Sequence, residues 1–375
     1  MIESYAAPTI RPMLTIGDLR ARLRELGAKP AHEYWLMQLW SQVLSQDHGR
    51  HQPQDHLPLL LRQALPDLIS DLSDLAGIAS EHLAQDGSQK LLVRLADGLT
   101  VESVLLPRSG LCVSTQIGCA VGCVFCMTGR SGLLRQLGSA EIVAQVALAR
   151  ARRRVNKVVF MGMGEPAHNL DNVLEAIQLL GTAGGIAHKN LVFSTVGDRR
   201  VFERLPLGPV KPALALSLHT TNATLRAQLL PHAPQIDPTE LIDLAQHYAQ
   251  ATGYPVQYQW TLLDGINDND GEIEAIVALL KGKYAVLNLI PYNALPDSPL
   301  RRPDAQRALA MTRKLCTRGV LTKLRQSAGQ DADAGCGQLR FRVTARSSSD
   351  DSVIKLQRPT PTPIPIPILA LRSNP

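Results

Sequence analysis

The chain has 375 residues, of which 45% are hydrophobic and 19% charged, and its formal net charge is +6. These values are ordinary for a globular protein, the length suffices for one large core and a smaller domain, and no apolar run is long enough to span a bilayer. The N-terminus lacks a basic segment followed by an apolar one, so we expect no signal peptide and a cytoplasmic location, where the six cysteines serve metals or catalysis.

Residues 15 to about 85 are predicted to be helical. Apolar residues recur there at helical spacing, as at Leu19 and Leu23. The following segments, 90–95 and 100–106, are apolar runs on either side of an Asp-Gly dipeptide. Asp-Gly between two such runs is a strong signal for a β-hairpin, so we expect a hairpin after the helices.

After the hairpin the chain alternates between strand and helix. Short apolar runs predict strands at 111–115, 157–161, 191–196, 212–217, 256–262, 285–290 and 320–325. Helical patterns fall between them, at 139–153, 171–183, 199–204, 239–252, 270–281 and 303–318. About six such repeats predict parallel β-α-β units in an α/β fold, built as a partial or full βα barrel. Active sites in such barrels collect at the C-terminal ends of the strands.

The composition changes again near the C-terminus. Residues 347–352 are rich in Ser and Asp, and 359–367 alternate Pro with Thr or Ile, which favours an extended and poorly packed segment. We therefore divide the chain into a helical accessory domain over 1–88, a barrel core over 89–346 and a disordered Pro-rich tail over 347–375 without a catalytic role.

Arginines gather in four places, at 150–154, 199–200, 301–302 and 340–346. Such clusters are consistent with nucleic-acid binding, although the net charge of +6 supports it only weakly. Solvated helix ends explain each cluster equally well, because arginine is favourable at a helix C-terminus.

The segment 118–126 carries the most informative chemical signal in the chain. Cys119, Cys123 and Cys126 stand in a C-x3-C-x2-C spacing, interleaved with glycines. Three thiolates can hold three irons of a 4Fe–4S cluster and leave the fourth iron open to bind and reduce a ligand. This spacing is typical of radical S-adenosylmethionine (SAM) enzymes.

Two other interpretations of these cysteines are weaker. Structural zinc usually takes four Cys or His ligands in paired spacings, and no second pair lies nearby. Free cysteines are often buried structural thiols, but three so close together, interleaved with glycines, are unusual in that role. We therefore adopt cluster ligation.

A glycine-rich turn follows the strand predicted at 157–161. Its sequence, Gly162-Met163-Gly164-Glu165-Pro166, lets the backbone approach a ligand closely. The backbone edge and Glu165 could hold the α-amino group of the methionyl part of SAM. A plain strand-to-loop turn is the alternative, but this turn comes one β-α unit after the cysteine loop.

These motifs, in this order, resemble the dual-specificity RNA methyltransferases, which are radical SAM enzymes that methylate an adenine carbon in bacterial ribosomal and transfer RNA. The resemblance covers roughly residues 88–345. It rests on the segments 101–104, 112–119, 162–166, 194–197, 217–219, 263–268, 290–293 and 335–339. It implies a partial (β/α)6-type radical SAM barrel with a small N-terminal helical domain that binds RNA.

The resemblance also implies a mechanism that uses two cysteines outside the cluster. Cys336 matches the cysteine that accepts a methyl group from one SAM molecule. A second SAM, cleaved reductively at the cluster, yields the 5′-deoxyadenosyl radical that activates this methyl group for addition to adenine. Cys112 matches the cysteine that forms a disulfide with Cys336 to release the product, and Glu102 matches the family's proton acceptor.

By the same resemblance, SAM contacts fall at the ends of successive strands. The implied residues are Gly164, Glu165, Ser194, Ser217, Leu218, His219 and Asn293. Thr195 could serve in place of Ser194, and His219 taken alone would be interpreted as a satisfied core histidine. Cys316, on a predicted amphipathic helix, matches no motif and is expected to be a buried structural thiol.

The expected partners are ribosomal or transfer RNA, two SAM molecules per turnover and an electron donor such as flavodoxin, with no membrane. We favour C2 of adenine over C8, which another branch of the family methylates. Residues 32–40 lack an arginine of the family pattern, so a divergent paralogue is one alternative. A radical SAM enzyme with a non-RNA substrate is another, and a non-enzymatic RNA-binding protein with zinc in the cysteine loop is a third.

Overall fold

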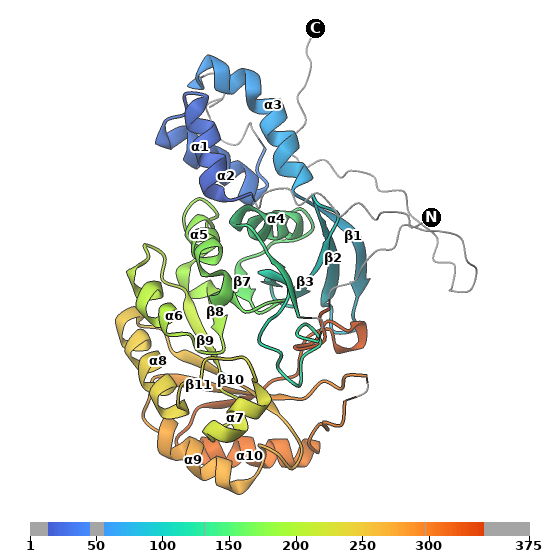
Figure 1. Cartoon of the computed structure of the whole chain (residues 1–375), viewed down its shortest axis with the longest axis vertical. Helices are drawn as coiled ribbons and strands as arrows, with labels where there is room; N and C mark the ends of the chain where they lie inside the picture. The colour runs from blue at the N-terminus through green and yellow to red at the C-terminus, as the bar shows by residue number, and fades with distance from the viewer. Residues whose placement is uncertain (1–13, 46–55, 131, 297, 341–375) are drawn as a thin grey trace, which may run out of the picture.

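A central sheet of ten strands forms the frame of the protein (Figure 1). The computed structural model describes residues 14–45, 56–130, 132–296 and 298–340. In this part of the chain the strand order is β1-β2-β3-β4-β7-β8-β9-β10-β11-β12, and a second, small sheet pairs β5 with β6. The Pro-rich tail expected over 347–375 lies outside the described residues.

In the ten-stranded sheet, β1, β2, β3 and β4 pair antiparallel with their neighbours. The strands β4, β7, β8, β9, β10, β11 and β12 of the same sheet run parallel. The strand bounds are β1 Ala76–Leu83, β2 Gln89–Leu95, β3 Thr100–Leu106, β4 Gly110–Cys112, β5 Gln116–Gly118, β6 Leu133–Gln136, β7 Lys157–Phe160, β8 Leu191–Thr195, β9 Ala213–Ser217, β10 Val256–Leu262, β11 Ala285–Pro291 and β12 Thr322–Leu324. The helix bounds are α1 Ile16–Glu25, α2 Pro30–Gln42, α3 Leu59–Asp74, α4 Ser139–Arg150, α5 Leu170–Gly181, α6 Arg199–Arg204, α7 Ala223–Leu229, α8 Pro238–Thr252, α9 Asp270–Leu280 and α10 Ala305–Thr317.

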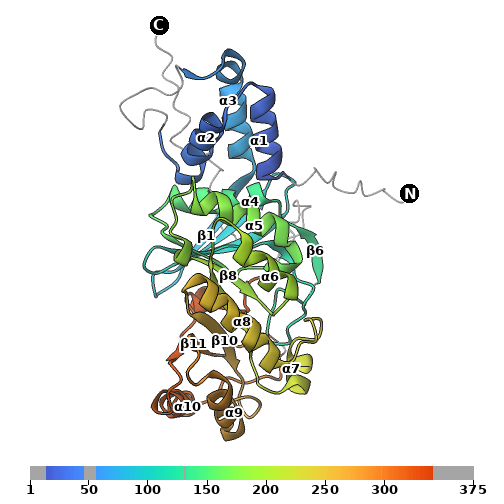
Figure 2. The ribbon, with the colours of Figure 1, turned by 90° about the vertical axis from the view of Figure 1, so that its left-hand side faces the viewer.

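Helices α4 to α10 connect the parallel strands in six β-α steps and lie outside the sheet, as α6 and α8 do in Figure 2. This arrangement confirms the predicted α/β class, with a partial (β/α)6-type barrel and a helical N-terminal part. The predicted hairpin is confirmed as well, because β2 pairs antiparallel with β3. The parallel strands could be found from sequence because each is a short run in which buried apolar residues recur, as in Leu191–Thr195, Ala213–Ser217 and Val256–Leu262.

The helical prediction is wrong at the end of the N-terminal region. Ala76–Leu83 form strand β1, which pairs antiparallel with β2. Most of β1 is exposed or half-buried, so its sequence carries no strong apolar alternation. Its pairing with β2 decides its conformation, and the sheet therefore begins before residue 88.

The N-terminal helices dock on the outer side of the barrel, above α4 and α5 in Figure 1. Ser139 at the start of α4 accepts a hydrogen bond from the backbone N–H of Ile16 at 2.8 Å, and Arg150 at its end donates to the carbonyl of Ser41 at 2.7 Å. Helix α4 is buried on almost every side, and its buried polar residues Glu141 and Gln145 form hydrogen bonds. None of the helices in the described segments has the length and apolar composition needed to cross a membrane.

Candidate active site

One face of the parallel sheet points into the barrel, and the strand register identifies it. Ser194 pairs with Ala215 of the next strand, and Ser217 pairs with Gln259. Paired residues of parallel strands share a face, and alternate residues of one strand do the same. The side chains on this inward face line an open cavity, and both serines and Gln259 are among its lining residues.

The cavity brings together ten of the thirteen residues that the sequence nominated, from segments scattered between β5 and the C-terminal part of the chain. These are Cys119, Cys123, Cys126, Gly164, Glu165, Ser194, Ser217, His219, Asn293 and Cys336. Glu102, Cys112 and Leu218 do not line it. Cys112 nevertheless belongs to the inner face of the barrel, because it pairs with Val159 in the same register.

The three clustered cysteines lie on the loop between β5 and β6. Gly118 opens this loop at φ +80°, and a Cβ atom there would lie 2.0 Å from the carbonyl oxygen of Gly132. The same carbonyl accepts a hydrogen bond from the N–H of Cys119 at 2.9 Å. A glycine is therefore required where the loop leaves the hairpin, and the loop returns to β6 through a close backbone contact.

The chemistry of the cysteine loop fits an iron–sulfur cluster. Burial raises the pKa of Cys119 to about 12, and burial with repulsion from Cys126 and Cys119 raises the pKa of Cys123 well above its ordinary value. Three thiolates here need compensating positive charge, which iron supplies. The described residues contain no group of three His, Cys, Asp or Glu side chains arranged to hold a metal ion.

Glu165 is a buried carboxyl at the edge of the cavity. Its N–H donates to Oε1 of Gln116 at 2.7 Å, and its Oε2 accepts from the N–H of Val196 at 3.1 Å. Gly164 has φ +101°, and a Cβ atom there would lie 2.6 Å from the Gln116 side chain. Burial raises the pKa of Glu165 to about 7, so a cationic group bound beside it would restore the charged form. Gln116 holds this turn in place, yet nothing in its sequence context pointed to that role.

His219 is both a cavity residue and a satisfied buried histidine. Its Nδ1 accepts a hydrogen bond from the N–H of Thr261 at 3.0 Å, and its ring centroid lies 4.7 Å from that of Phe125 in the cysteine loop. Burial, followed by the charge of Arg226, lowers the pKa of His219 to about 3, so the imidazole is neutral. Leu218 is fully buried away from the cavity, and its N–H donates to the carbonyl of Gln259 at 3.1 Å.

Asn293 links the SAM candidates to Cys336. Its Nδ2 donates to Oγ of Ser327 at 2.8 Å and to the carbonyl of Cys336 at 3.0 Å. Its Oδ1 is buried and has no hydrogen-bond partner among the described residues. Since Asn293 lines the cavity, this oxygen is an acceptor available to a bound ligand, as a SAM site requires.

Cys336 is an exposed residue on a segment tied to the cysteine loop. The N–H of Met127 donates to the carbonyl of Gly337 at 2.7 Å, and Oγ1 of Thr128 donates to the carbonyl of Leu339 at 2.7 Å. Two residues of the cysteine loop thus hold the backbone on the C-terminal side of Cys336. The structure places the cluster candidates and Cys336 around one cavity, although more than 200 residues separate Thr128 from Leu339.

Cys112 is buried at the end of β4, close enough to Cys336 for their charges to interact. Burial and repulsion from Cys336 raise the pKa of Cys112 far above its ordinary value. All six cysteines are free thiols, so the Cys112–Cys336 disulfide is not formed in this structure. The expectation for Cys316 is wrong: it is exposed on α10, with its Sγ 3.4 Å from the carbonyl oxygen of Thr322. It follows the buried Leu315 and lies beyond the edge of the apolar stripe.

Glu102 lies on β3, outside the cavity. Its Oε1 is 3.7 Å from Nζ of Lys90, and its Oε2 accepts a hydrogen bond from the N–H of Arg340 at 2.9 Å. Both charged side chains are almost completely buried. Glu102 therefore anchors the segment that follows Cys336, and its role as a proton acceptor stays a prediction.

Arg226 on α7 is a site residue that the sequence did not reveal. It is buried, and its Nη2 donates to the carbonyls of Val196 and Ser217, the latter at 3.1 Å. It thereby joins the loop after β8 to the end of β9, between two strands that carry SAM candidates. An arginine on a short helix gave no signal of this contact.

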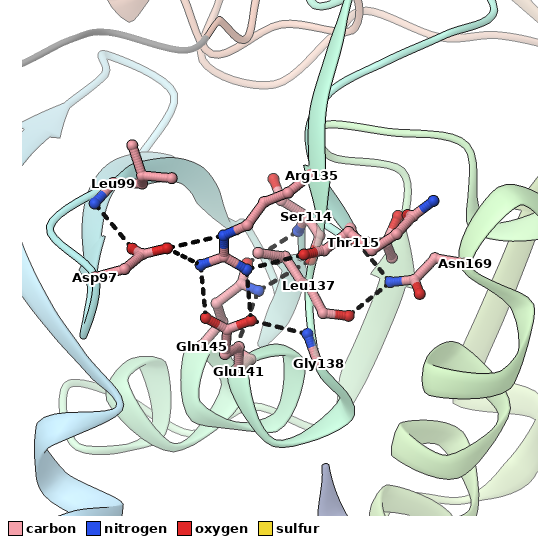
Figure 3. A network of polar contacts seen from close by, with 11 residues as sticks. Asp97, Leu99, Ser114, Thr115, Arg135, Leu137, Gly138, Glu141, Gln145 and Asn169 are labelled. Atoms are coloured by element: carbon pink, nitrogen blue, oxygen red, sulfur yellow. Dashed lines mark hydrogen bonds and ion pairs between the residues drawn. The ribbon is translucent and has the colours of Figure 1, made fainter. Parts of the chain in front are cut away.

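A buried ionic network holds the hairpin that carries the cysteine loop (Figure 3). Arg135 on β6 donates through Nε to Asp97 at 2.8 Å and through Nη1 and Nη2 to Glu141 at 2.9 and 2.8 Å. Asp97 lies in the β2–β3 turn, and Glu141 also accepts from the N–H of Gly138 at the start of α4 at 2.8 Å. One guanidinium thus joins the hairpin, the antiparallel sheet and α4.

We expect Arg135→Met to lower the free energy of unfolding by about 3–5 kcal/mol, because it leaves two nearly buried carboxylates without a counter-charge. Chemical denaturation followed by circular dichroism measures this change. Arg204→Met is the matched control, because Arg204 pairs with Asp171 at an exposed position and should cost about 1 kcal/mol or less. Equal losses in the two variants would contradict the assigned role.

Comparison with known proteins identifies the family of the chain. The family model of the radical SAM superfamily matches residues 113–280, which include the cysteine loop. A protein of Leptothrix cholodnii named "Probable RNA methyltransferase" is 68% identical over 335 residues, covering 89% of this chain and 96% of that protein. A protein of Pseudomonas aeruginosa with the same description is 64% identical over 329 residues, covering 87% of this chain and 95% of that protein.

A solved structure shares the fold. The crystal structure of a radical SAM methyltransferase from Sphaerobacter thermophilus matches with a TM-score of 0.73 and 34% sequence identity, covering 87% of this chain and 98% of that one. The identity and coverage of these relatives, together with the cysteine loop at the mouth of the barrel, lead to one assignment. The chain belongs to the SAM-dependent methyltransferases of the radical SAM superfamily.

Proposed function

We propose that the protein transfers a methyl group from SAM to a ring carbon of adenine in RNA, with C2 favoured, through a methylated Cys336. The position of Cys336 carries this proposal. It is exposed, lines the same cavity as Cys119, Cys123 and Cys126, and is tied to their loop by backbone hydrogen bonds. Most other radical SAM chemistry has no need of a methyl-carrying cysteine at this place.

The need for such a cysteine follows from the substrate. An adenine ring carbon is a poor nucleophile, so direct transfer of a methyl cation from SAM would be slow. When bound, the cluster and SAM supply a 5′-deoxyadenosyl radical. The chain's part is to present the thioether of Cys336 beside that chemistry and to keep bulk water away with a mainly apolar wall, which includes Val121, Phe125 and Tyr292.

We propose roles for the other cavity residues from their contacts. Glu165 and the backbone of Gly164 hold the amino group of SAM, since this buried carboxyl gains its charge most readily beside a cation. Asn293 offers its free Oδ1 to the adenosyl part. Ser194 is better placed than Thr195 for a contact, because Ser194 lines the cavity whereas Thr195 accepts from the N–H of Gly197 at 3.0 Å.

The remaining contacts and partners complete the proposal. Ser217 contacts SAM through its side chain, Leu218 and His219 contact it through the end of β9, and two SAM molecules are used per turnover. The substrate is ribosomal or transfer RNA whose target adenine is splayed out of its stack to reach Cys336. The N-terminal segment 1–88 binds that RNA, a flavodoxin-like donor supplies electrons, and the reaction takes place in the cytoplasm.

The test uses SAM with a trideuterated methyl group. The reconstituted protein should convert adenosine in RNA to a C-methyladenosine, because one deuterium leaves the methyl group with the radical and is replaced by a solvent proton, so the product carries two deuteriums. Mass spectrometry of the digested nucleosides measures both position and label. A Cys123→Ala variant should give no product. Three retained deuteriums, methylation on nitrogen, or unmodified RNA would each contradict the proposal.

A further inference from the structure

Three cations share the inner face of the barrel at its open side. Lys157 begins β7 opposite Gly110, and Lys323 on β12 pairs with Asn288. The register connects them to the face that carries Ser194 and Ser217, through the pairs Val159–Val192, Val192–Ala213, Ala215–Gln257 and Gln259–Asn288. Arg325 follows two residues after Lys323 and donates through Nε to Oδ1 of Asn288 at 3.0 Å, so it shares that face.

These three cations, called here the lumen cations, lie near enough to one another for their like charges to repel. Partial burial, followed by repulsion from Arg325 and from Lys323, holds the pKa of Lys157 below its ordinary value. Each of the three residues is exposed. In the described segments none of them forms an ion pair with a carboxylate. Gathering like charges in this way costs stability and creates a positive surface that attracts anions.

The arginine clusters noted in the sequence differ from the lumen cations, because internal contacts engage most of their members. These contacts are Arg150 with the carbonyl of Ser41, Arg152 with Glu81, Arg153 with the carbonyl of Leu106, Arg199 with Glu240, Arg200 with Asp198 and Arg340 with Asp333. The arginine clusters found from the sequence therefore consist mainly of residues that stabilise the fold. The lumen cations come from segments more than 150 residues apart and remain available.

The lumen cations also lie where an RNA strand can reach them, at the edge of the sheet. In the described residues β12 is the last strand of the sheet and pairs only with β11. Among the residues that the structure describes, Lys323 and Arg325 therefore stand at an edge that no further strand covers, and Lys157 lies within reach of their charges. Lysine and arginine side chains bind phosphate through charge and donated hydrogen bonds, without reading base sequence.

We propose that Lys157, Lys323 and Arg325 form a phosphate-binding site that holds the backbone of the substrate RNA along the open side of the barrel. The inference rests on the proposed RNA substrate and adds a site to it. The site fixes the RNA relative to the barrel, while the cavity at the strand ends receives the base.

The test compares two triple variants of the full, cluster-loaded protein. The first carries Lys157→Gln, Lys323→Gln and Arg325→Gln. The second carries Arg199→Gln, Arg204→Gln and Arg318→Gln, which remove the same charge from exposed residues already paired with Glu240, Asp171 and Glu274. The probe is a synthetic RNA stem-loop with an unpaired adenine, and its dissociation constant is measured over a series of salt concentrations.

The lumen variant should bind the RNA about 10- to 100-fold more weakly at physiological salt. A plot of the logarithm of its binding constant against the logarithm of the salt concentration should have a slope smaller in magnitude by about 2, since each phosphate contact with single-stranded RNA contributes about 0.7 to that slope. The control variant should keep the wild-type slope. Single substitutions, each expected to reduce the slope by about 0.7, provide the same test if the triple variant does not fold.

Four outcomes would overturn the inference. An unchanged slope in the lumen variant, beside normal binding by the wild type, removes the site and leaves the proposed function standing. Equal slope changes in both triple variants show an effect of net charge alone. Binding of inorganic phosphate to the wild type, lost in the lumen variant without any change in RNA binding, shows that the site serves a free anion. A wild type that binds no RNA at all overturns the proposed substrate together with the site.

Discussion

Cys336→Ala should reduce RNA methylation by a factor on the order of 10⁴ or more, because the covalent carrier of the methyl group is gone and no other thiol replaces it at the cavity. Cys112 is buried outside the cavity lining, and Cys119, Cys123 and Cys126 are committed to the cluster in the proposed mechanism. Cys336 is exposed at the surface of its segment, so the substitution removes a thiol without opening a core cavity.

The measurement is methyl transfer to RNA under anaerobic turnover, combined with two readouts that the variant should leave unchanged. These are the visible absorbance of the cluster and the dissociation constant for SAM. Cys316→Ala is the matched control, because it also replaces an exposed cysteine, on α10 outside the cavity, and should keep full activity. Turnover by the Cys336→Ala protein at the wild-type rate would end the proposal of a methylated cysteine.

The sequence predicted the strands and the cysteine motif well, because buried apolar runs and a fixed cysteine spacing are local patterns. Parallel strands such as Lys157–Phe160 and Val256–Leu262 are apolar enough to be recognised, and the cysteine spacing is a local motif. The cavity gathers ten residues named from sequence, because most of them lie at or just after the C-terminal ends of strands, which a barrel brings together. That part of the site follows from topology once the alternation of strand and helix is recognised.

The sequence failed where a residue acts through long-range pairing. Strand β1 depends on its contact with β2, so its own composition did not distinguish it from the preceding helices. Gln116 and Arg226 hold backbone groups of Glu165 and Val196, which are 49 and 30 residues away in sequence. The lumen cations come together only through the strand register. Cys316 illustrates the opposite error, because an amphipathic stripe predicts which side of a helix is buried but not where its edge falls.

Cys112→Ala should stop the reaction at the release step, after the methylation of Cys336 and the addition to adenine, and leave a covalent bond between protein and RNA. In the proposed release step, the sulfur of Cys112 attacks the sulfur of Cys336. A disulfide forms as the carbon–sulfur bond to the RNA-bound methylene breaks, the bonding electron pair passes to carbon, and carbon takes a proton to become the methyl group. The two cysteines lose two electrons to the former methylene carbon, so the step balances without an outside oxidant.

The structure supports this pairing in part. Cys112 lies on the inner face of the barrel at the end of β4, and burial together with the nearby Cys336 raises its pKa, so both cysteines are present as neutral free thiols. With alanine at residue 112, we expect most of the protein after one turnover to migrate as an RNA adduct on a denaturing gel, and RNase digestion should leave a methylene-linked adenosine on the peptide that contains Cys336. Cys316→Ala should show no adduct, and neither should Cys112→Ala, Cys336→Ala together. If Cys112→Ala released methylated RNA over repeated turnovers, a different group would have to resolve the intermediate, and Cys112 would be only a buried thiol of the barrel.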